Sequence, residues 1–123
     1  MIVQAGAAGI TFQLQEWIPG NTSKLVQLDG FVDRGGTIRA MLARRRVRMD
    51  PPRIANTASS VTISLAEVSQ PAAEVRKLLA EVGYRGIFSA EFKFDERDQQ
   101  FKIIEVNARP YCCLLYTSDA ADE

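Results

Sequence analysis

The sequence predicts an α+β fold in which an antiparallel β-sheet carries one main helix. Two observations lead to this fold class. Apolar and polar residues alternate in several short runs separated by turn residues, which is the period of a β-strand. One run, residues 71–82, instead repeats its apolar residues at helical spacing. At 123 residues the chain is long enough for one domain with a modest core.

The first half of the chain is predicted to consist mostly of strands. Residues 2–9 are interpreted as the end of a helix that stops at Gly9, and residues 10–18 alternate as a strand. The remaining elements of this half are predicted in order as strands at 25–32, 37–48 and 61–65, a hairpin loop at 33–36, and loops at 50–53 and 54–60.

The helix at 71–82 is the clearest element, because Pro71 suits a first helical turn and Gly83 suits the residue after the last turn. Two more strands follow, at 87–94 and 101–107, joined by a charged loop at 95–100. The stripe that should face the core of the domain is Val75, Leu78, Leu79 and Val82.

Composition excludes several kinds of chemistry. The chain has no histidine, which rules out Ser-His and Cys-His nucleophile pairs and His-ligated zinc. The two cysteines are adjacent and predict no disulfide framework. The formal net charge is zero and no apolar run approaches a membrane span, so neither nucleic acid nor a membrane is an expected partner. Any chemistry must use carboxylates, amides, Lys, Arg and backbone groups.

Two acidic residues are predicted to meet across the last two strands. In 87–94, Ser89, Glu91 and Lys93 alternate with the apolar face Phe88, Ala90, Phe92 and Phe94. In 101–107, the residues predicted to share a face are Phe101, Ile103, Glu105 and Asn107. If Asp95 pairs with Phe101, Glu91 lies opposite Glu105, and Asn107 is diagonal to Glu91.

Opposed like charges destabilise a sheet, so we expect a cation between these carboxylates or a proton on one of them. Two carboxylates and an amide oxygen suit Mg²⁺ that also binds phosphate, and Arg109 adds donors for phosphate or carboxylate. The alternative is a solvent-facing polar strand whose charge is offset by Lys93 or Arg109, since a slip of one residue would separate the pair.

The stretch GIFSAEFKFDERDQQFKIIEVNARPY resembles the C-terminal signature of ATP-grasp enzymes. The stretch LQEWIPG, residues 14–20, is similar to the hinge strand of that family. The resemblance covers residues 1–111 and is nearest to the carboxylate–amine ligase branch, beside carbamoyl-phosphate-synthase-like and D-aspartate-ligase-like proteins. It implies an incomplete C-terminal lobe of the ATP-grasp fold, in a cytoplasmic protein.

The resemblance also implies ligands and roles. The cofactors would be ATP and Mg²⁺, with Mn²⁺ a possible substitute, and the substrates a small carboxylate and an amine joined through an acyl phosphate. The implied residues are Glu91, Glu105 and Asn107 for the metal, Arg109 for the transferring phosphate, and Gln15, Glu16, Trp17 and Ile18 for the adenine. The acidic ribose contact of many members has no counterpart in residues 21–23.

Both ends of the sequence differ from the expected pattern. The substrate domain and the lobe with a phosphate-binding lysine and a glycine-rich loop, which precede this region in the family, are not in the sequence, so we expect the chain to be inactive by itself. CLLYTSDAADE, residues 113–123, resembles a translated sequencing adaptor, which makes 112–123 a non-native tail; a genuine frayed acidic tail is the alternative. Without 113–123 the net charge is about +3.

Two features have competing interpretations. On a strand, Arg44, Arg46 and Arg48 share one face and Arg45 the other, which would suit a non-catalytic nucleic-acid-binding β module. A solvated sheet edge is the simpler reading of this arginine strand. Trp17 would stack on adenine or, as is commoner at a strand end, pack in the core.

Overall fold

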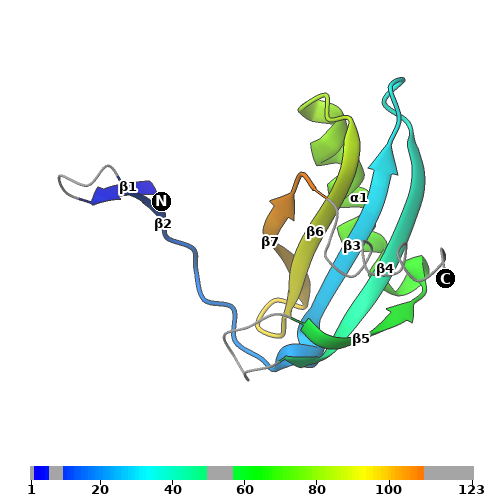
Figure 1. Ribbon diagram of the computed structural model, residues 1–123. Coiled ribbons are helices and arrows are strands. Elements are labelled where there is room, and N and C mark those ends of the chain that lie inside the picture. Colours follow the sequence, from blue (N-terminus) through cyan, green and yellow to red (C-terminus); the bar gives the residue numbers. More distant parts are fainter. Residues whose placement is uncertain (1, 6–9, 50–56, 110–123) are drawn as a thin grey trace, which may run out of the picture.

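The computed structural model describes residues 2–5, 10–49 and 57–109 and confirms the α+β class. Two short strands, β1 (Ile2–Ala5) and β2 (Ile10–Gln13), form an antiparallel pair. A second sheet has five strands in the order β5-β4-β3-β6-β7, each antiparallel to its neighbours (Figure 1). These strands are β3 (Leu25–Val32), β4 (Ile38–Met49), β5 (Thr57–Ile63), β6 (Gly86–Asp95) and β7 (Gln100–Asn107).

The helix α1 (Ser69–Glu81) packs on one face of the large sheet and makes the core there (Figure 1). It follows the short 3₁₀ helix η3 (Leu65–Val68), which starts at a capping box between Ser64 and Glu67. From the sheet, the predicted apolar face of β6 contributes Phe88, Ala90 and Phe92, all fully buried. Because α1 covers only this face, the other face of the sheet is left for polar side chains.

The predicted helical stripe is correct at its centre and wrong at its end. Val75 and Leu79 are buried and Leu78 is partly buried, but Val82 is 65% exposed. The helix ends at this point, with Gly83 at a φ of +64°. Val82 is the C-terminal cap residue of α1 and has no core to face.

Three boundaries predicted from the sequence are wrong. Residues 2–5 form strand β1 rather than the end of a helix, and the predicted strand at 10–18 ends at Gln13. The predicted loop at 54–60 is strand β5 from Thr57 onward. In each case pairing with a partner strand decides the outcome, which local propensity does not encode. The predicted loop at 50–53, the first residues of the 54–60 loop and the tail at 112–123 lie outside the described residues.

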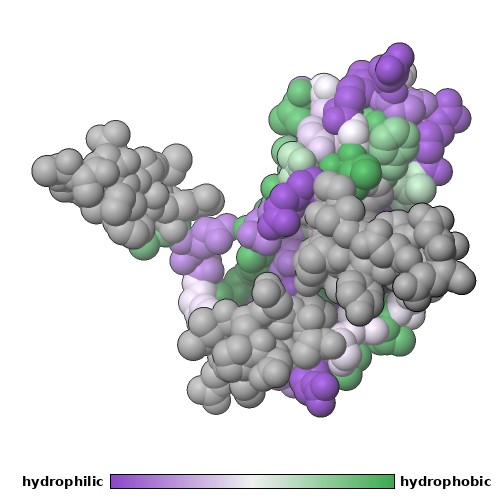
Figure 2. Space-filling model, in the orientation of Figure 1, coloured by the Kyte–Doolittle hydropathy of each residue, from purple (hydrophilic) through white to green (hydrophobic). Residues whose placement is uncertain are grey.

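The hairpin loop predicted at 33–36 is confirmed between β3 and β4. Asp33 accepts hydrogen bonds from the Thr37 backbone N–H and the Arg39 side chain, and Gly36 takes a φ of +86°. These contacts lower the pKa of Asp33, the backbone hydrogen bond from Thr37 being the largest cause. Hydrophilic residues gather at this turn (Figure 2). Among the described residues, no helix reaches the length and apolarity that crossing a membrane requires.

Candidate functional site

The sheet face opposite α1 carries ionisable and amide side chains in register across three strands. Gln27 on β3 pairs with Glu91 on β6, which pairs with Glu105 on β7. The neighbouring row, two residues along, aligns Asp29, Ser89 and Asn107 in the same order. We call this surface the ligand face.

The predicted opposition of Glu91 and Glu105 is confirmed, but by a different register. Asp95 pairs with Gln100 rather than with Phe101, and an irregularity in β7 then adds one residue, Ile104, before Glu105. Phe101 therefore packs against the core instead of sharing a face with Glu105. Because of this bulge, the consecutive residues Ile104 and Glu105 both lie on the ligand face.

The cation expected beside the carboxylates is Arg46, a residue of β4. Its Nη2 atom donates to both carboxylate oxygens of Glu91, at 3.0 Å each. Both side chains are mostly buried, 11% exposed for Arg46 and 13% for Glu91. Burial raises the pKa of Glu91, Arg46 acts against this rise, and the charge of Glu105 adds to it. The two glutamates are thus close enough to repel each other, and neither Lys93 nor Arg109 supplies the counter-charge.

A second buried ion pair holds the neighbouring row of the ligand face. The Arg44 guanidinium donates to Asp29 through Nε at 2.9 Å and Nη2 at 2.5 Å. The Gln27 amide donates to Asp29 at 3.0 Å and to the Ser89 hydroxyl at 2.8 Å. The solvated-edge interpretation of Arg44 and Arg46 is therefore wrong, because β4 is an interior strand and both arginines point onto the ligand face.

The prediction that Arg45 faces the other side of β4 is confirmed. Its Nη2 atom lies 3.0 Å from Glu67 of η3, on the side of the sheet that α1 covers. The arginine run thus divides its charges between the two faces of the sheet, as strand geometry requires.

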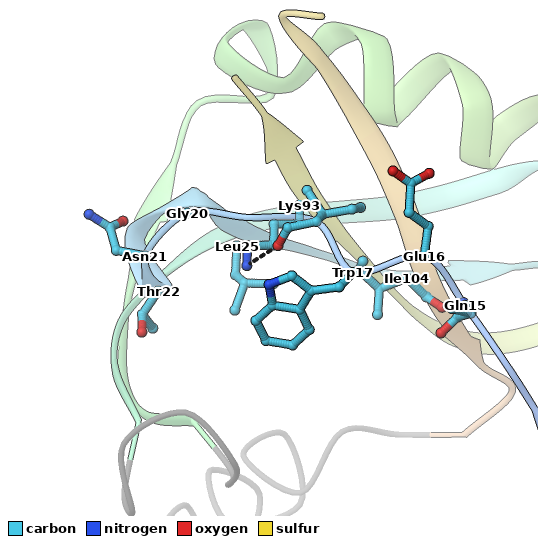
Figure 3. Close-up of a pocket in the computed structure, with 10 residues that line it drawn as sticks. Gln15, Glu16, Trp17, Gly20, Asn21, Thr22, Leu25, Lys93 and Ile104 are labelled. Atoms are coloured by element: carbon cyan, nitrogen blue, oxygen red, sulfur yellow. Dashed lines mark hydrogen bonds between the residues drawn. The ribbon is translucent and has the colours of Figure 1, made fainter. Parts of the chain in front are cut away.

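A pocket of about 800 Å³ lies at one end of the ligand face, within the size range of small-molecule sites. The Lys93 ammonium donates to the Ile18 carbonyl at 2.7 Å and lies 5.0 Å from the centre of the Trp17 ring. Figure 3 shows the Trp17 indole at this pocket, with the carboxylate of Glu16 pointing away from it. The pocket lining is Gln15, Glu16, Trp17, Ile18, Gly20, Asn21, Thr22, Leu25, Lys93 and Ile104.

All four residues predicted for the adenine hinge thus line one pocket. Trp17 is 75% exposed, so the interpretation of this side chain as core packing is wrong. Ile18, in contrast, is buried. Burial also lowers the pKa of the Lys93 ammonium, which is held by a carbonyl and an aromatic face.

The segment before the pocket is tied to the last hairpin at two further points. The Gln15 side chain donates to the Ile104 carbonyl at 2.7 Å. Arg97 bridges Glu16 at 2.8 Å and Asp95 at 2.7 Å. Asp95 is buried at the end of β6, and its pKa is lowered to about 2, first by the Arg97 hydrogen bond. Asp95 is therefore more than the loop residue that the sequence predicted.

The pocket and the carboxylate pair are adjacent on one surface. Lys93 of the pocket is two residues from Glu91 on β6, and Ile104 of the pocket directly precedes Glu105 on β7. Two residues of a strand span roughly 7 Å, which is within the length of a nucleotide. A ligand seated against Trp17 can therefore extend along the strands toward Glu91.

Arg109, the remaining predicted site residue, lies in a bend just beyond β7 and is exposed. Among the residues that the structure describes, no group of three or more Asp, Glu, His or Cys gathers as a metal cluster. Sequence reasoning missed Arg46, Lys93 and Ile104 as members of the site. The alternation of Arg44 and Arg46 on a strand was the available signal for the first, whereas the bulge that exposes Ile104 leaves no local signature.

The family of the chain follows from its sequence similarity to known proteins. Residues 41–112 match the family model for the carbamoyl-phosphate synthase L chain, ATP binding domain. The match covers more than half of the chain, so the chain belongs to this family of ATP-binding domains. The match agrees with the resemblance of its two motifs to the carboxylate–amine ligase branch of the ATP-grasp proteins.

A D-aspartate ligase from Enterococcus faecium (strain Aus0004) is 27% identical to the chain over 96 residues. The alignment covers 78% of this chain and 23% of the ligase, so the chain spans about a quarter of the length of this curated relative. No solved structure matches the chain.

Proposed function

We propose that the chain binds the base of ATP in the Trp17 pocket and the metal-bound polyphosphate at Glu91, Glu105 and Asn107. The observation that carries this proposal is the placement of the pocket and the two opposed carboxylates on one face, two residues apart. Gln15, Glu16, Trp17 and Ile18 supply the wall of the pocket. Arg109 then lies beyond Asn107, at the end of β7, where it contacts the transferring phosphate.

The donor set fits Mg²⁺, with Mn²⁺ as a substitute. Glu91 already takes a cationic partner, and Glu105 faces it across the sheet. The Asn107 amide donates to Glu105 at 2.8 Å, so its side chain is within reach of the same position. Two carboxylates and one amide leave room for phosphate oxygens and water, the arrangement that Mg²⁺ favours.

The chemistry that follows is activation of a carboxylate. A carboxylate is a poor electrophile until the terminal phosphoryl group of ATP converts it to an acyl phosphate, from which an amine displaces phosphate. The bound metal supplies charge neutralisation on the phosphate oxygens. The protein residues orient the nucleotide and stabilise charge, and no side-chain nucleophile is needed in a chain without histidine.

The whole enzyme is proposed to be a cytoplasmic ligase that joins a small carboxylate to an amine, since its relative is a D-aspartate ligase. The 123-residue chain is proposed to be inactive alone, because the lysine and glycine-rich loop of the family resemblance are not in its sequence. ATP hydrolysis by the purified chain would contradict this part of the proposal.

The decisive experiment is calorimetric titration of the chain with ATP, with and without Mg²⁺. We expect binding that needs Mg²⁺ and that is lost in Glu105→Gln but kept in Glu74→Gln, a matched change on the exposed side of α1. Binding of equal strength without Mg²⁺, or in the Glu105 variant, would refute the metal-phosphate site.

The alternative, a nucleic-acid-binding module that uses the Arg44–Arg48 strand, is less well supported. Arg44 and Arg46 are engaged in buried ion pairs with Asp29 and Glu91, so they are poorly placed to contact a phosphate backbone. Salt-sensitive RNA binding that survives Glu105→Gln and is lost in Arg44→Met would favour it.

A further inference from the structure

The ion pair between Arg46 and Glu91 has an unusual geometry. One guanidinium nitrogen, Nη2, donates to both oxygens of the carboxylate, and within the described part of the chain Nε and Nη1 of Arg46 donate to no acceptor. Arg44, on the same strand and face, instead directs both Nε and Nη2 at Asp29. An arginine side chain that is only 11% exposed and uses one nitrogen has donors to spare for a second anion.

The unused donors of Arg46 lie beside a carboxylate of the proposed metal site. Its partner Glu91 is the carboxylate that faces Glu105, so the guanidinium already neutralises one of the two carboxylates that the proposed metal would bind. A guanidinium and a divalent cation that share the two oxygens of Glu91 repel each other, which disfavours simultaneous binding. Metal binding at Glu91 therefore competes with the ion pair to Arg46.

We propose that Arg46 is an anion-binding residue of this site, exchanged between two partners. Without metal, Arg46 neutralises Glu91; with metal, it turns its donors to a phosphoryl oxygen of the nucleotide that the metal brings. The inference rests on the proposed function and assigns to Arg46 a phosphate contact within the nucleotide site. The ligand chemistry is a γ-phosphoryl oxyanion, which ATP carries and ADP lacks.

The test measures Mn²⁺ binding to the full chain by the electron paramagnetic resonance signal of free Mn²⁺, first without nucleotide. Arg46→Met removes the competitor for Glu91, so the Kd for Mn²⁺ should fall, by about tenfold if one charge-assisted contact is removed. Arg45→Met is the matched control, a neighbouring arginine of β4 that pairs with Glu67 on the opposite face of the sheet, and should leave the Kd for Mn²⁺ within about twofold of the original value.

The second arm measures nucleotide binding in saturating Mn²⁺. Arg46→Met should raise the Kd for ATP about tenfold and change the Kd for ADP much less, because the lost contact is to the γ-phosphoryl group, which ADP lacks. A purely structural arginine would not give a variant that binds Mn²⁺ more tightly and ATP more weakly. Arg46→Lys keeps the charge but not the fork, so it should bind Mn²⁺ as the original chain does and still bind ATP more weakly.

Each outcome decides the inference. Weaker or unchanged Mn²⁺ binding in a folded Arg46→Met variant overturns it, as does unchanged ATP affinity. If Arg46→Met fails to fold, Arg46→Lys decides, and unaltered ATP affinity there counts against the exchange. Failure of the original chain to bind Mn²⁺ or ATP would defeat the proposed function together with this inference. Binding that Glu91→Gln abolishes but Arg46→Met leaves unchanged would defeat the inference alone.

Discussion

The ammonium of Lys93 donates to the carbonyl of Ile18 at 2.7 Å, which joins a sheet strand to a segment that belongs to no strand. Lys93→Met keeps the length of the side chain but removes this bond and the contact with the Trp17 ring. Affinity for ATP should fall about three- to tenfold. Trp17 is the only tryptophan in the sequence, so quenching of its fluorescence by ATP reports the pocket directly.

Lys102→Met is the control for this change. Lys102 pairs with Lys93 across β6 and β7, but its ammonium contacts Asp98 and it does not line the pocket. Its affinity for ATP should match that of the original chain. Equal losses in both variants would show that general charge, and not the Lys93 contacts, governs binding.

Glu105→Gln should weaken metal binding and stabilise the fold at once. Removing one of two opposed carboxylates relieves repulsion worth about 0.2–1 kcal/mol in a sheet. The same change removes a charged metal ligand, so we expect the Kd for Mn²⁺ to rise at least about tenfold. Urea unfolding and Mn²⁺ titration measure the two effects, and a variant that loses stability would argue against repulsion at this pair.

Acid should unfold the chain partly through Asp95. The pKa of this carboxyl is lowered from 3.8 to about 2, chiefly by Arg97. A carboxyl whose pKa is lower in the folded chain than in the unfolded chain stabilises the fold. This stabilisation is complete at pH values above the pKa of the unfolded chain and is lost as the pH falls toward 2. The free energy of unfolding should therefore drop between about pH 4 and pH 2 in the original chain and drop less in Asp95→Asn. Urea titrations followed by circular dichroism across this range test the difference.

Asp98→Asn provides the comparison for the pH series, since it removes the same charge from an exposed position in the next turn. Its unfolding profile should keep the steep acid limb. Parallel profiles for Asp95→Asn and the original chain would mean that other groups account for the acid sensitivity.

Two glycines should respond differently to alanine. At Gly30, a Cβ would lie 2.5 Å from the Phe88 ring and 2.6 Å from the Ala40 carbonyl oxygen, so Gly30→Ala should cost about 1–3 kcal/mol or more through overpacking. At Gly83 a Cβ meets nothing within 4 Å, and only the φ of +64° opposes it, at about 1–2 kcal/mol. Urea midpoints give both costs, and Gly83 as the more costly position would contradict this account.

Local patterns predict much of this fold because alternation and helical spacing are properties of short segments. β3, β4, α1, β6 and β7 lie within a few residues of their predicted ranges. The predictions for segments 2–5 and 57–60 are wrong because the strand character of these segments depends on partners in β2 and β4. Such pairing is information that no short window of sequence contains.

The site is predictable where it follows from one hairpin and unpredictable where it spans several strands. Glu91 opposite Glu105 follows from alternation within two strands joined by a short loop. Arg46 reaches Glu91 from β4, on the far side of β3, so its partner is set by the order of strands in the sheet. Core packing is the commoner expectation for Trp17 because large aromatic side chains usually lie in the core, whereas this one borders a pocket.

The extra residue in β7, Ile104, separates the pocket from the acidic pair of Glu91 and Glu105. Ile104 lines the pocket and accepts from Gln15 through its carbonyl, while Glu105 keeps its place opposite Glu91. A shortened β7 without Ile104 would retain the acidic pair by ordinary strand alternation and would remove one residue from the wall of the pocket. In the proposed nucleotide site, the contact with the base and the contact with the metal-bound phosphates are thus encoded by consecutive codons, and evolution can alter one while leaving the other untouched.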